Sequence, residues 1–217
     1  MEFFERLEAE RGRYDVLSHP FYTRWSAGEL TREELALYAG QYRHAVLALA
    51  EQSRAAAEAA DDPATRTELE LHAREEEAHV ELWDRFVHSL GGSTEATPAA
   101  ESKRCAAAWT AGESQEERLA VLFAVESAQP AISQTKLDGL AEHYGVAPDD
   151  DAASYFALHS RRDEEHAAQA RRLIEANARR CDDSRLLEVA LGALEGNWDL
   201  LDGVERAIAA EAAAPVQ

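Results

Sequence analysis

The stretch YFALHSRRDEEH, which begins at Tyr155, carries three groups that could bind a metal at helical spacing. In a helix His159, Asp163 and His166 occupy positions i, i+4 and i+7, so their side chains lie above one another on one face. Leu173, seven residues after His166, continues the same face with an apolar side chain. The polar trio therefore stands where a helix normally keeps its apolar seam, and imidazole with carboxylate is a donor set for a divalent metal.

Two further stretches carry groups of the same kind. Glu76 and His79 have the Glu-x-x-His spacing that di-iron carboxylate bundles use, on a stripe that continues to Trp83. Glu126 follows a full turn of apolar residues in VLFAVESAQP. Any one such motif arises easily by chance among 42 acidic residues and 8 histidines, which usually lie on solvated faces. The occurrence of all three on apolar stripes is what favours a common site.

Burial of these groups together favours bound cations. An ionised carboxylate that leaves water without a partner costs on the order of several kcal/mol, and two divalent metals would neutralise three carboxylates held among imidazoles. Mixed oxygen and nitrogen ligands suit iron or manganese, and the lack of thiolates argues against a structural zinc site. Cys105 and Cys181 form no C-x-x-C pair, so we expect neither a disulfide framework nor a thiolate metal site.

The elements that must position these residues are helices, because the apolar period is helical almost throughout. Thr31 with Glu34, and Ser114 with Glu117, have capping-box spacing, and Pro130 should kink the helix that contains it. Seven or eight helices without a strand run or a repeat predict an all-α bundle. The expected helices are one in the opening stretch, then 31–60, 63–90, 98–111, 115–144, 155–175 and 183–213.

Composition limits the class of protein. The 217 residues are 46% hydrophobic and contain no Gly/Ser-rich or Pro-rich linker, which favours one domain over residues 1–217. The formal charge of −20 argues against nucleic acid and anionic membrane partners. No apolar run reaches the roughly 20 residues of a membrane span, and the charged N-terminus does not resemble a secretory signal. We therefore expect a cytoplasmic protein.

Four segments follow one another along the chain: HPFYTRWSAGELTREELALYAGQYRH, EEEAHVELWDRF, ESAQPAISQTKLDGLAEHYG and YFALHSRRDEEH. In that order they resemble the signature blocks of the haem-oxygenase-like dimetal oxidases, most of all the CADD-like branch, which is related to TenA and PqqC. The similarity covers roughly residues 15–175. The resemblance implies a haem-oxygenase-like bundle of seven or eight helices without haem, and a non-haem dimetal centre (Fe/Fe or Fe/Mn) that activates O₂.

The metal ligands implied by the resemblance are Glu76, His79, Glu126, His159, Asp163 and His166. The first block departs from the pattern, because CADD-like sequences carry a few more residues between the acidic pair and the histidine. Glu75 could therefore replace Glu76, since both lie close enough along a helix to face His79. His72, Glu76 and His79 repeat the spacing of His159, Asp163 and His166. His72 is therefore either an outer partner of a ligand or a competing ligand.

The CADD-like branch also implies 4-aminobenzoate synthesis for folate, in which a tyrosine of the protein supplies the ring and a lysine is implicated in supplying the amine. The matching residues are Tyr22, Tyr38 and Lys136. Lys136 and Lys103 are the only lysines among 22 basic residues, and an arginine in that place could not lose a proton to act as an amine donor. Ten residues of straight helix would hold Lys136 about 15 Å from Glu126 unless the helix bends.

Other functions remain open at this point. Dimetal relatives can act on an external amino acid or fatty acid. A metal-free enzyme like TenA or PqqC would use the same bundle as a small-molecule pocket, and a non-catalytic interaction protein would need none of the six ligands. A dimetal oxidase would also require an external reductant, and a homodimer is compatible with the sequence.

Overall fold

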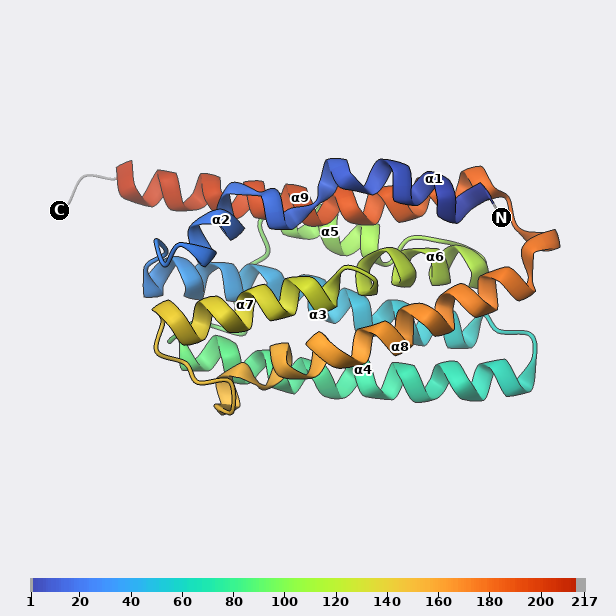
Figure 1. The fold of residues 1–217 in the computed structure, drawn as a ribbon, viewed down its shortest axis with the longest axis horizontal. Coiled ribbons are helices and arrows are strands. Elements are labelled where there is room, and N and C mark those ends of the chain that lie inside the picture. The colour runs from blue at the N-terminus through green and yellow to red at the C-terminus, as the bar shows by residue number, and fades with distance from the viewer. Residues whose placement is uncertain (1, 214–217) are drawn as a thin grey trace.

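Two long antiparallel helices, α3 (Arg32–Glu58) and α4 (Pro63–Ser89), pack side by side in the computed structural model, which describes residues 2–213 (Figure 1). Helices and short 3₁₀ turns make up the regular structure of that part of the chain, and it contains no strand. The all-α prediction is confirmed. The remaining helices are α1 (Glu2–Glu10), α2 (Pro20–Ser26), α5 (Ala100–Trp109), α6 (Gln115–Glu126), α7 (Gln129–His143), α8 (Ser154–Ala176) and α9 (Asp183–Ala213).

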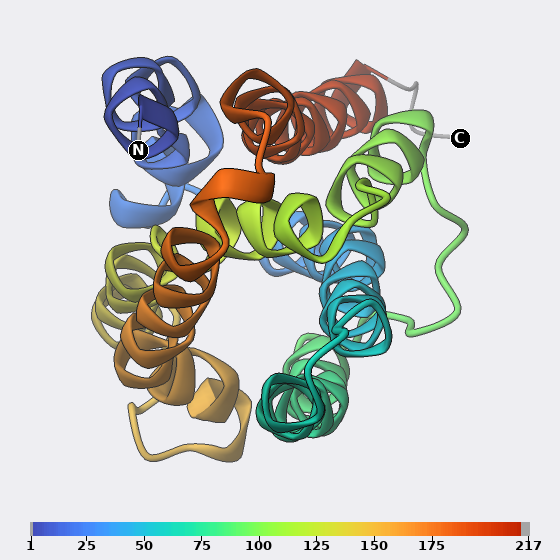
Figure 2. The ribbon, with the colours of Figure 1, turned by 90° about the vertical axis from the view of Figure 1, so that its right-hand side faces the viewer.

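The arrangement of these helices places α8 beside both α6 and α7, and α9 beside α1, α5 and α6. Figure 2, viewed along the bundle, shows α4 and α8 facing one another on the side of the bundle opposite α9. None of the helices in the described range is long and apolar enough to cross a membrane. The three helices that carry the predicted metal ligands, α4, α6 and α8, therefore enclose one region of the interior.

Helix starts follow the capping signals in the sequence, with one difference. Thr31 and Glu34 form a complete capping box: the Thr31 Oγ1 accepts from the Glu34 amide at 3.2 Å, and the Glu34 carboxylate accepts from the Thr31 amide at 2.7 Å. Ser114 accepts from the Glu117 amide at 3.2 Å, but the Glu117 carboxylate accepts from the Glu113 amide at 3.1 Å. The second box is therefore only half formed.

The expected kink at Pro130 is a complete break between two helices. Helix α6 ends at Glu126, and α7 begins at Gln129 with Pro130 in its first turn. Proline has no amide hydrogen, and its ring would clash with the carbonyl four residues earlier, which is that of Glu126. The Ala128 amide instead bonds the Val125 carbonyl at 3.3 Å, a tighter turn than an α-helix makes. The break redirects α7, which carries Lys136.

Aromatic residues form the centre of the apolar core. Trp25, Trp83 and Trp109 are fully buried, and each indole N–H donates to a backbone carbonyl, at 3.3, 2.9 and 3.0 Å respectively. A buried indole needs such a partner. Both cysteines are free thiols, with Cys105 buried and Cys181 partly exposed, as the sequence predicts. Each tryptophan thus links its own helix to a neighbouring one through a buried hydrogen bond.

Candidate metal centre

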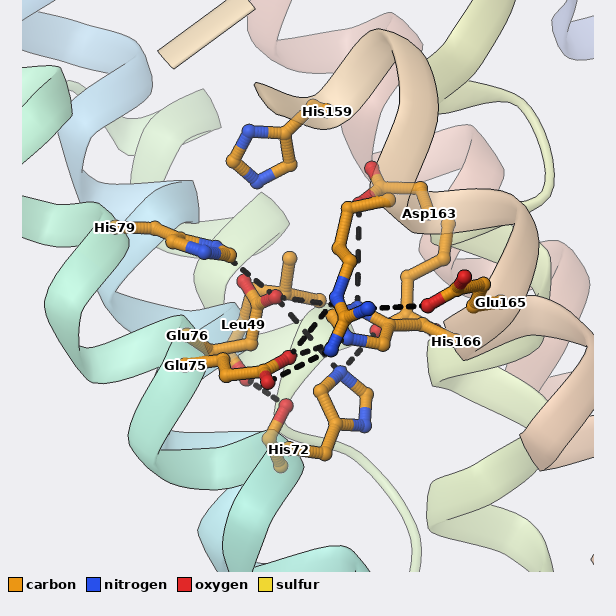
Figure 3. Close-up of polar contacts among 12 residues, drawn as sticks. Leu49, His72, Glu75, Glu76, His79, His159, Asp163, Glu165 and His166 are labelled. Carbon is orange, nitrogen blue, oxygen red and sulfur yellow. Dashed lines mark hydrogen bonds and ion pairs between the residues drawn. The ribbon is translucent and has the colours of Figure 1, made fainter. Parts of the chain in front are cut away.

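Helices α4, α6 and α8 bring all six predicted ligands into one buried cluster. Figure 3 shows His72, Glu76 and His79 of α4 lying opposite His159, Asp163 and His166 of α8. His72, which the sequence left as an alternative, lies among them and is also buried. This cluster consists of His72, Glu76, His79, Glu126, His159, Asp163 and His166.

One group within the cluster consists of His72, Glu76, Glu126 and His166. One potential ligand atom from each lies within 4.8 Å of the others. His72 Nε2 is 2.9 Å from Glu126 Oε1, and His166 Nδ1 is 3.5 Å from Glu76 Oε1. Two carboxylates and two imidazoles from three helices therefore converge on a volume that one cation could fill.

A second group consists of Glu76, His79 and His159, again with ligand atoms within 4.8 Å of one another. His79 Nδ1 lies 3.1 Å from Glu76 Oε1. Glu76 belongs to both groups, so its carboxylate could serve as a ligand in either. Asp163 belongs to neither group, although its Oδ1 is 4.0 Å from His166 Nδ1.

Unpartnered polar atoms give a direct test of whether the cluster suits metal ions. Native proteins leave few buried polar atoms without a hydrogen bond. The cluster concentrates such atoms, and all of them belong to metal-ligating types, so the residues fit a centre of divalent cations. They are His72 Nε2, Glu76 Oε1, His79 Nδ1, both oxygens of Glu126, His159 Nε2, both oxygens of Asp163, and His166 Nδ1.

Contacts around the cluster orient two of its imidazoles. His159 Nδ1–H donates to the Tyr155 carbonyl at 2.7 Å, and the two rings stack with centroids 3.9 Å apart. His166 Nε2 lies 2.9 Å from Glu75 Oε2, and the other oxygen of Glu75 accepts from Arg162 at 2.8 Å. In each imidazole one nitrogen is held by an oxygen and the other faces the cluster, which is the usual arrangement around a metal-bound histidine.

The position of Glu75 bears on the alternative that the sequence left open. Its carboxylate is about a quarter exposed and lies on the outer side of His166, whereas that of Glu76 is 3% exposed and faces the cluster. The geometry therefore favours Glu76 as the inward carboxylate and Glu75 as its outer neighbour. Both lie one turn from His79, so helical periodicity alone did not separate them.

The carboxylates of the cluster perturb one another. Burial, with the neighbouring charges of Glu126 and Glu76, raises the pKa of Asp163 to about 10. Burial acts in the same direction on Glu76, but His79 and His159 outweigh it and lower the pKa of Glu76 to about 2. Burial lowers the pKa of His159 to about 4. In the metal-free protein the Asp163 carboxyl therefore holds a proton near pH 7, and a bound cation would replace that proton.

The three predicted non-ligand residues also meet. The Lys136 ammonium nitrogen lies 5.4 Å from the ring centroid of Tyr22 and 5.5 Å from that of Tyr38, and the two tyrosine hydroxyls are 3.2 Å apart. Three further rings, those of Tyr42, Trp83 and Phe156, lie 4.8, 5.5 and 5.2 Å from the same nitrogen. Lys136 is 1% exposed, and its burial lowers the pKa of the amine to about 7.

The sequence reasoning missed part of this enclosure. Tyr42 lies one helical turn after Tyr38, and its spacing predicts the shared face of α3 that the structure shows, but nothing in the sequence related Tyr42 to Lys136. Gln129 donates to the Tyr42 hydroxyl at 3.2 Å and fixes that ring. Phe156 is next to Tyr155 in the chain, and no spacing rule relates it to Lys136. The approach of α8 to α7 brings it there.

Similarity to known proteins agrees with this geometry. Residues 37–197 match the family described as iron-containing redox enzyme. The 4-aminobenzoate synthase of Chlamydia muridarum is 34% identical over 93% of this chain and 89% of its own length. The 4-aminobenzoate synthase of Nitrosomonas europaea is 32% identical over 87% of this chain and 85% of its own.

Solved structures share the fold. A domain of unknown function with a haem oxygenase-like fold from Shewanella denitrificans superposes with a TM-score of 0.81 at 18% identity, covering 98% of this chain and 96% of that one. A TenA homologue from P. horikoshii gives 0.75 at 16% identity, covering 94% and 98%. With a family match across most of its length, this bundle and a buried carboxylate–imidazole cluster, the chain belongs to the iron-containing redox enzymes of haem oxygenase-like fold and is an oxidoreductase.

Proposed function

We propose that this dimetal oxidase forms 4-aminobenzoate from its own Tyr22, with Lys136 supplying the amino group and Tyr38 assisting. The observation that carries the proposal is the enclosure of the Lys136 amine by the Tyr22 and Tyr38 rings, in the same apolar core as Tyr155, which stacks on His159 of the cluster. The names of the relatives, 4-aminobenzoate synthase, support the product class. The six predicted ligands, together with His72 from the first group of ligand atoms, are proposed to hold two ions, either two iron ions or one iron and one manganese.

The bound metals would supply the transfer of electrons to O₂, with an external reductant returning the ions to their reduced state. The protein residues contribute the rest. Glu76 would supply ligand atoms to either group, His159 and His166 are oriented by their outer contacts, and burial keeps bulk water from the reacting groups.

Protonation of the three non-ligand residues fits the proposed chemistry. Burial raises the pKa of both tyrosines well above the usual range, so each ring is a neutral phenol. Oxidation of Tyr22 must then release its hydroxyl proton. The Tyr38 hydroxyl, 3.2 Å away, is the hydrogen-bonding neighbour of that group, and as a neutral phenol it could take the proton only while passing on its own. The lowered pKa of Lys136 makes the neutral amine accessible near pH 7, whereas an arginine there would stay charged.

A continuous series of aromatic contacts joins the tyrosine pair to a proposed ligand. Ring centroids are 5.4 Å apart for Tyr38 and Tyr42, 5.0 Å for Tyr42 and Trp83, and 4.8 Å for Trp83 and Tyr155. Tyr155 in turn stacks on His159 at 3.9 Å. Such rings can lose an electron in succession, which supports oxidation of Tyr22 by a centre that it does not touch.

A second candidate is a dimetal oxidase that acts on an external small molecule. A cavity of about 420 Å³ lies between the N-terminal segment, α7 and α9, and its wall includes Trp109, Ile132 and Val125, the neighbour of Glu126. A pocket of that volume suits a small organic substrate. The cytoplasmic location, the lack of nucleic-acid and membrane partners, and a homodimer likewise remain proposals.

Isotope labelling separates the two candidates. Protein made with ring-labelled tyrosine, loaded anaerobically with iron or with iron and manganese and exposed to O₂ and reductant, should release labelled 4-aminobenzoate. The yield should not exceed about one equivalent per chain, and intact mass should show a matching loss. Tyr22→Phe and Lys136→Arg should each abolish product and leave metal content unchanged.

The matched control for the lysine is Lys103→Arg, which alters an exposed residue and should leave the yield unchanged. Unlabelled product, or many turnovers on an added small molecule, would contradict the self-derived substrate and favour the external one. Normal yield from Lys136→Arg would remove the lysine from the mechanism.

A further inference from the structure

An open groove of about 560 Å³ runs between α4 and α8 and reaches the cluster from the surface. At its inner end are His72 and His166, both buried, with His72 Nε2 facing Glu126 at 2.9 Å and His166 Nδ1 facing Glu76 at 3.5 Å. At its outer end are Leu71, which is 55% exposed, and the exposed Glu165. The groove therefore connects solvent to two residues of the proposed metal centre.

Two ion pairs cross this groove, Glu68–Arg172 and Glu75–Arg162, and the second lies next to the cluster. Glu75 of α4 and Arg162 of α8 are both partly exposed, with Arg162 donating to Glu75 at 2.8 Å. The second oxygen of Glu75 lies against His166 Nε2 at 2.9 Å, so this carboxylate touches the ion pair and the cluster at once. Exposed ion pairs of this kind contribute little to stability, so the Arg162 contact can open without loss of the fold.

The charges along the groove suit a cation. Glu68 and Glu165 lie at its outer part, and each pairs with an arginine, Arg172 and Arg162 respectively. An arginine side chain can move away from a carboxylate that takes a divalent ion, because the ion is the stronger partner at short range. Carboxylates along a groove also raise the local concentration of cations.

We propose that this groove is the route by which divalent metal ions enter and leave the centre, with the Glu75–Arg162 pair as its gate. An incoming ion displaces Arg162 from Glu75, is held there by the carboxylate, and passes to the inward ring nitrogens, Nε2 of His72 and Nδ1 of His166, which face Glu126 and Glu76. Arg162 then returns to Glu75 and closes the groove. This inference rests on the proposed dimetal centre and adds how that centre is filled.

Two other cavities among residues 2–213 do not reach the cluster. The cavity of about 420 Å³ beside the N-terminal segment has no cluster member in its wall. A groove of about 360 Å³ on the other face of α4 contains the ion pair of Arg54 with Glu77, and it also lacks any cluster residue. The Arg54–Glu77 pair is thus a matched control: it has the same chemistry and also involves α4, but it does not lie over the centre.

The test measures rates of metal uptake and loss by the full chain. Metal-free protein is mixed with Mn²⁺ and quenched with chelator at increasing times, and protein-bound manganese is determined. Loss is followed by adding chelator to loaded protein. Arg162→Gln should increase both rates at least fivefold and keep the number of bound ions. Ala168→Trp, which places a large ring in the groove from an exposed position, should slow both rates. Arg54→Gln should match the parent.

The outcomes separate this inference from the centre itself. If the parent binds two ions but Arg162→Gln and Ala168→Trp take them up at the parent's rates, the groove is not the route and the centre stands. If Arg54→Gln changes the rates as much as Arg162→Gln does, the effect is a general one of surface charge and the gate is wrong. If the parent binds no metal, the centre and the route both fail.

Discussion

His166 Nε2 lies 2.9 Å from Oε2 of Glu75, on the far side of the imidazole ring from Nδ1, which faces the cluster without a hydrogen bond. This relationship gives two adjacent glutamates different tasks. Glu75 fixes the ring plane of a proposed ligand from outside, and Glu76 presents its carboxylate inside. Carboxylates that hold metal-bound imidazoles in this way commonly tune both orientation and basicity.

Glu75→Gln should weaken metal binding without changing its stoichiometry. The amide can still contact His166 but no longer carries the charge that supports it, and such outer contacts contribute about 10- to 100-fold in affinity. Glu76→Gln should instead lose at least one equivalent, because Glu76 belongs to both groups of ligand atoms. Competition titration with a chelator of known affinity measures both effects. Equal losses from the two variants would contradict the division of tasks.

His72→Gln should selectively weaken one of the two proposed ions. His72 Nε2 lies 2.9 Å from Glu126, and its removal leaves the group of Glu76, His79 and His159 intact. Manganese titration should show one site near the parent's affinity and one weakened at least about tenfold, since a lost ligand costs at least what an outer contact does. His44→Gln alters a histidine outside the cluster and serves as the control. Two unchanged sites would make His72 an outer residue.

Lys136→Met should stabilise the metal-free protein most at pH 7 and below. The folded-state pKa of this lysine is about 7 against an ordinary 10.5, so folding must bury a charge at low pH and the penalty is of the order of a few kcal/mol. The penalty fades as pH rises from 7 toward 10.5, by about 1.4 kcal/mol per pH unit. Urea unfolding from pH 6 to 9 tests this.

The control for that series is Lys103→Met, because Lys103 is exposed and should give the same difference from the parent at every pH. A gap between Lys136→Met and the parent that stays constant with pH would mean that Lys136 titrates normally. In that case the neutral amine invoked for its role would not be accessible near pH 7.

Asp163→Asn should stabilise the metal-free protein increasingly as pH rises. The carboxyl has a folded-state pKa of about 10 against an ordinary 3.8, so the folded state retains a proton that the unfolded state has released. The stability of the protonated form is fully present below about pH 4 and is lost as pH approaches 10. Asparagine, which does not titrate, avoids that loss.

Bound metal should make the parent more stable than Asp163→Asn, which is the reverse of their order without metal. An ion that binds only the folded state raises its stability according to concentration and affinity, and Asp163→Asn lacks one proposed ligand charge. Thermal unfolding at pH 8, with and without excess Mn²⁺, should show a larger increase in Tm for the parent than for the variant. An equal increase would exclude Asp163 as a ligand.

The helices and the proposed ligands could be predicted because they depend on local rules. Thr31 caps its helix through residues three positions away, and the spacing of His159, Asp163 and His166 places them on one face whatever the helix packs against. Their position on an apolar stripe also indicated burial, because that stripe is what a helix turns toward the core. All six predicted ligands are buried for this reason.

The packing of the helices decided between residues whose roles local spacing could not distinguish. Glu75 and Glu76 differ by one position on α4, and only the place of His166 on α8 makes one outer and the other inner. Lys136 lies ten residues from Glu126, and only the break before Pro130 and the approach of α2, α3 and α8 enclose its amine in aromatic rings. Contacts between residues far apart in the chain depend on the angles at which whole helices pack, and no short sequence pattern specifies those angles.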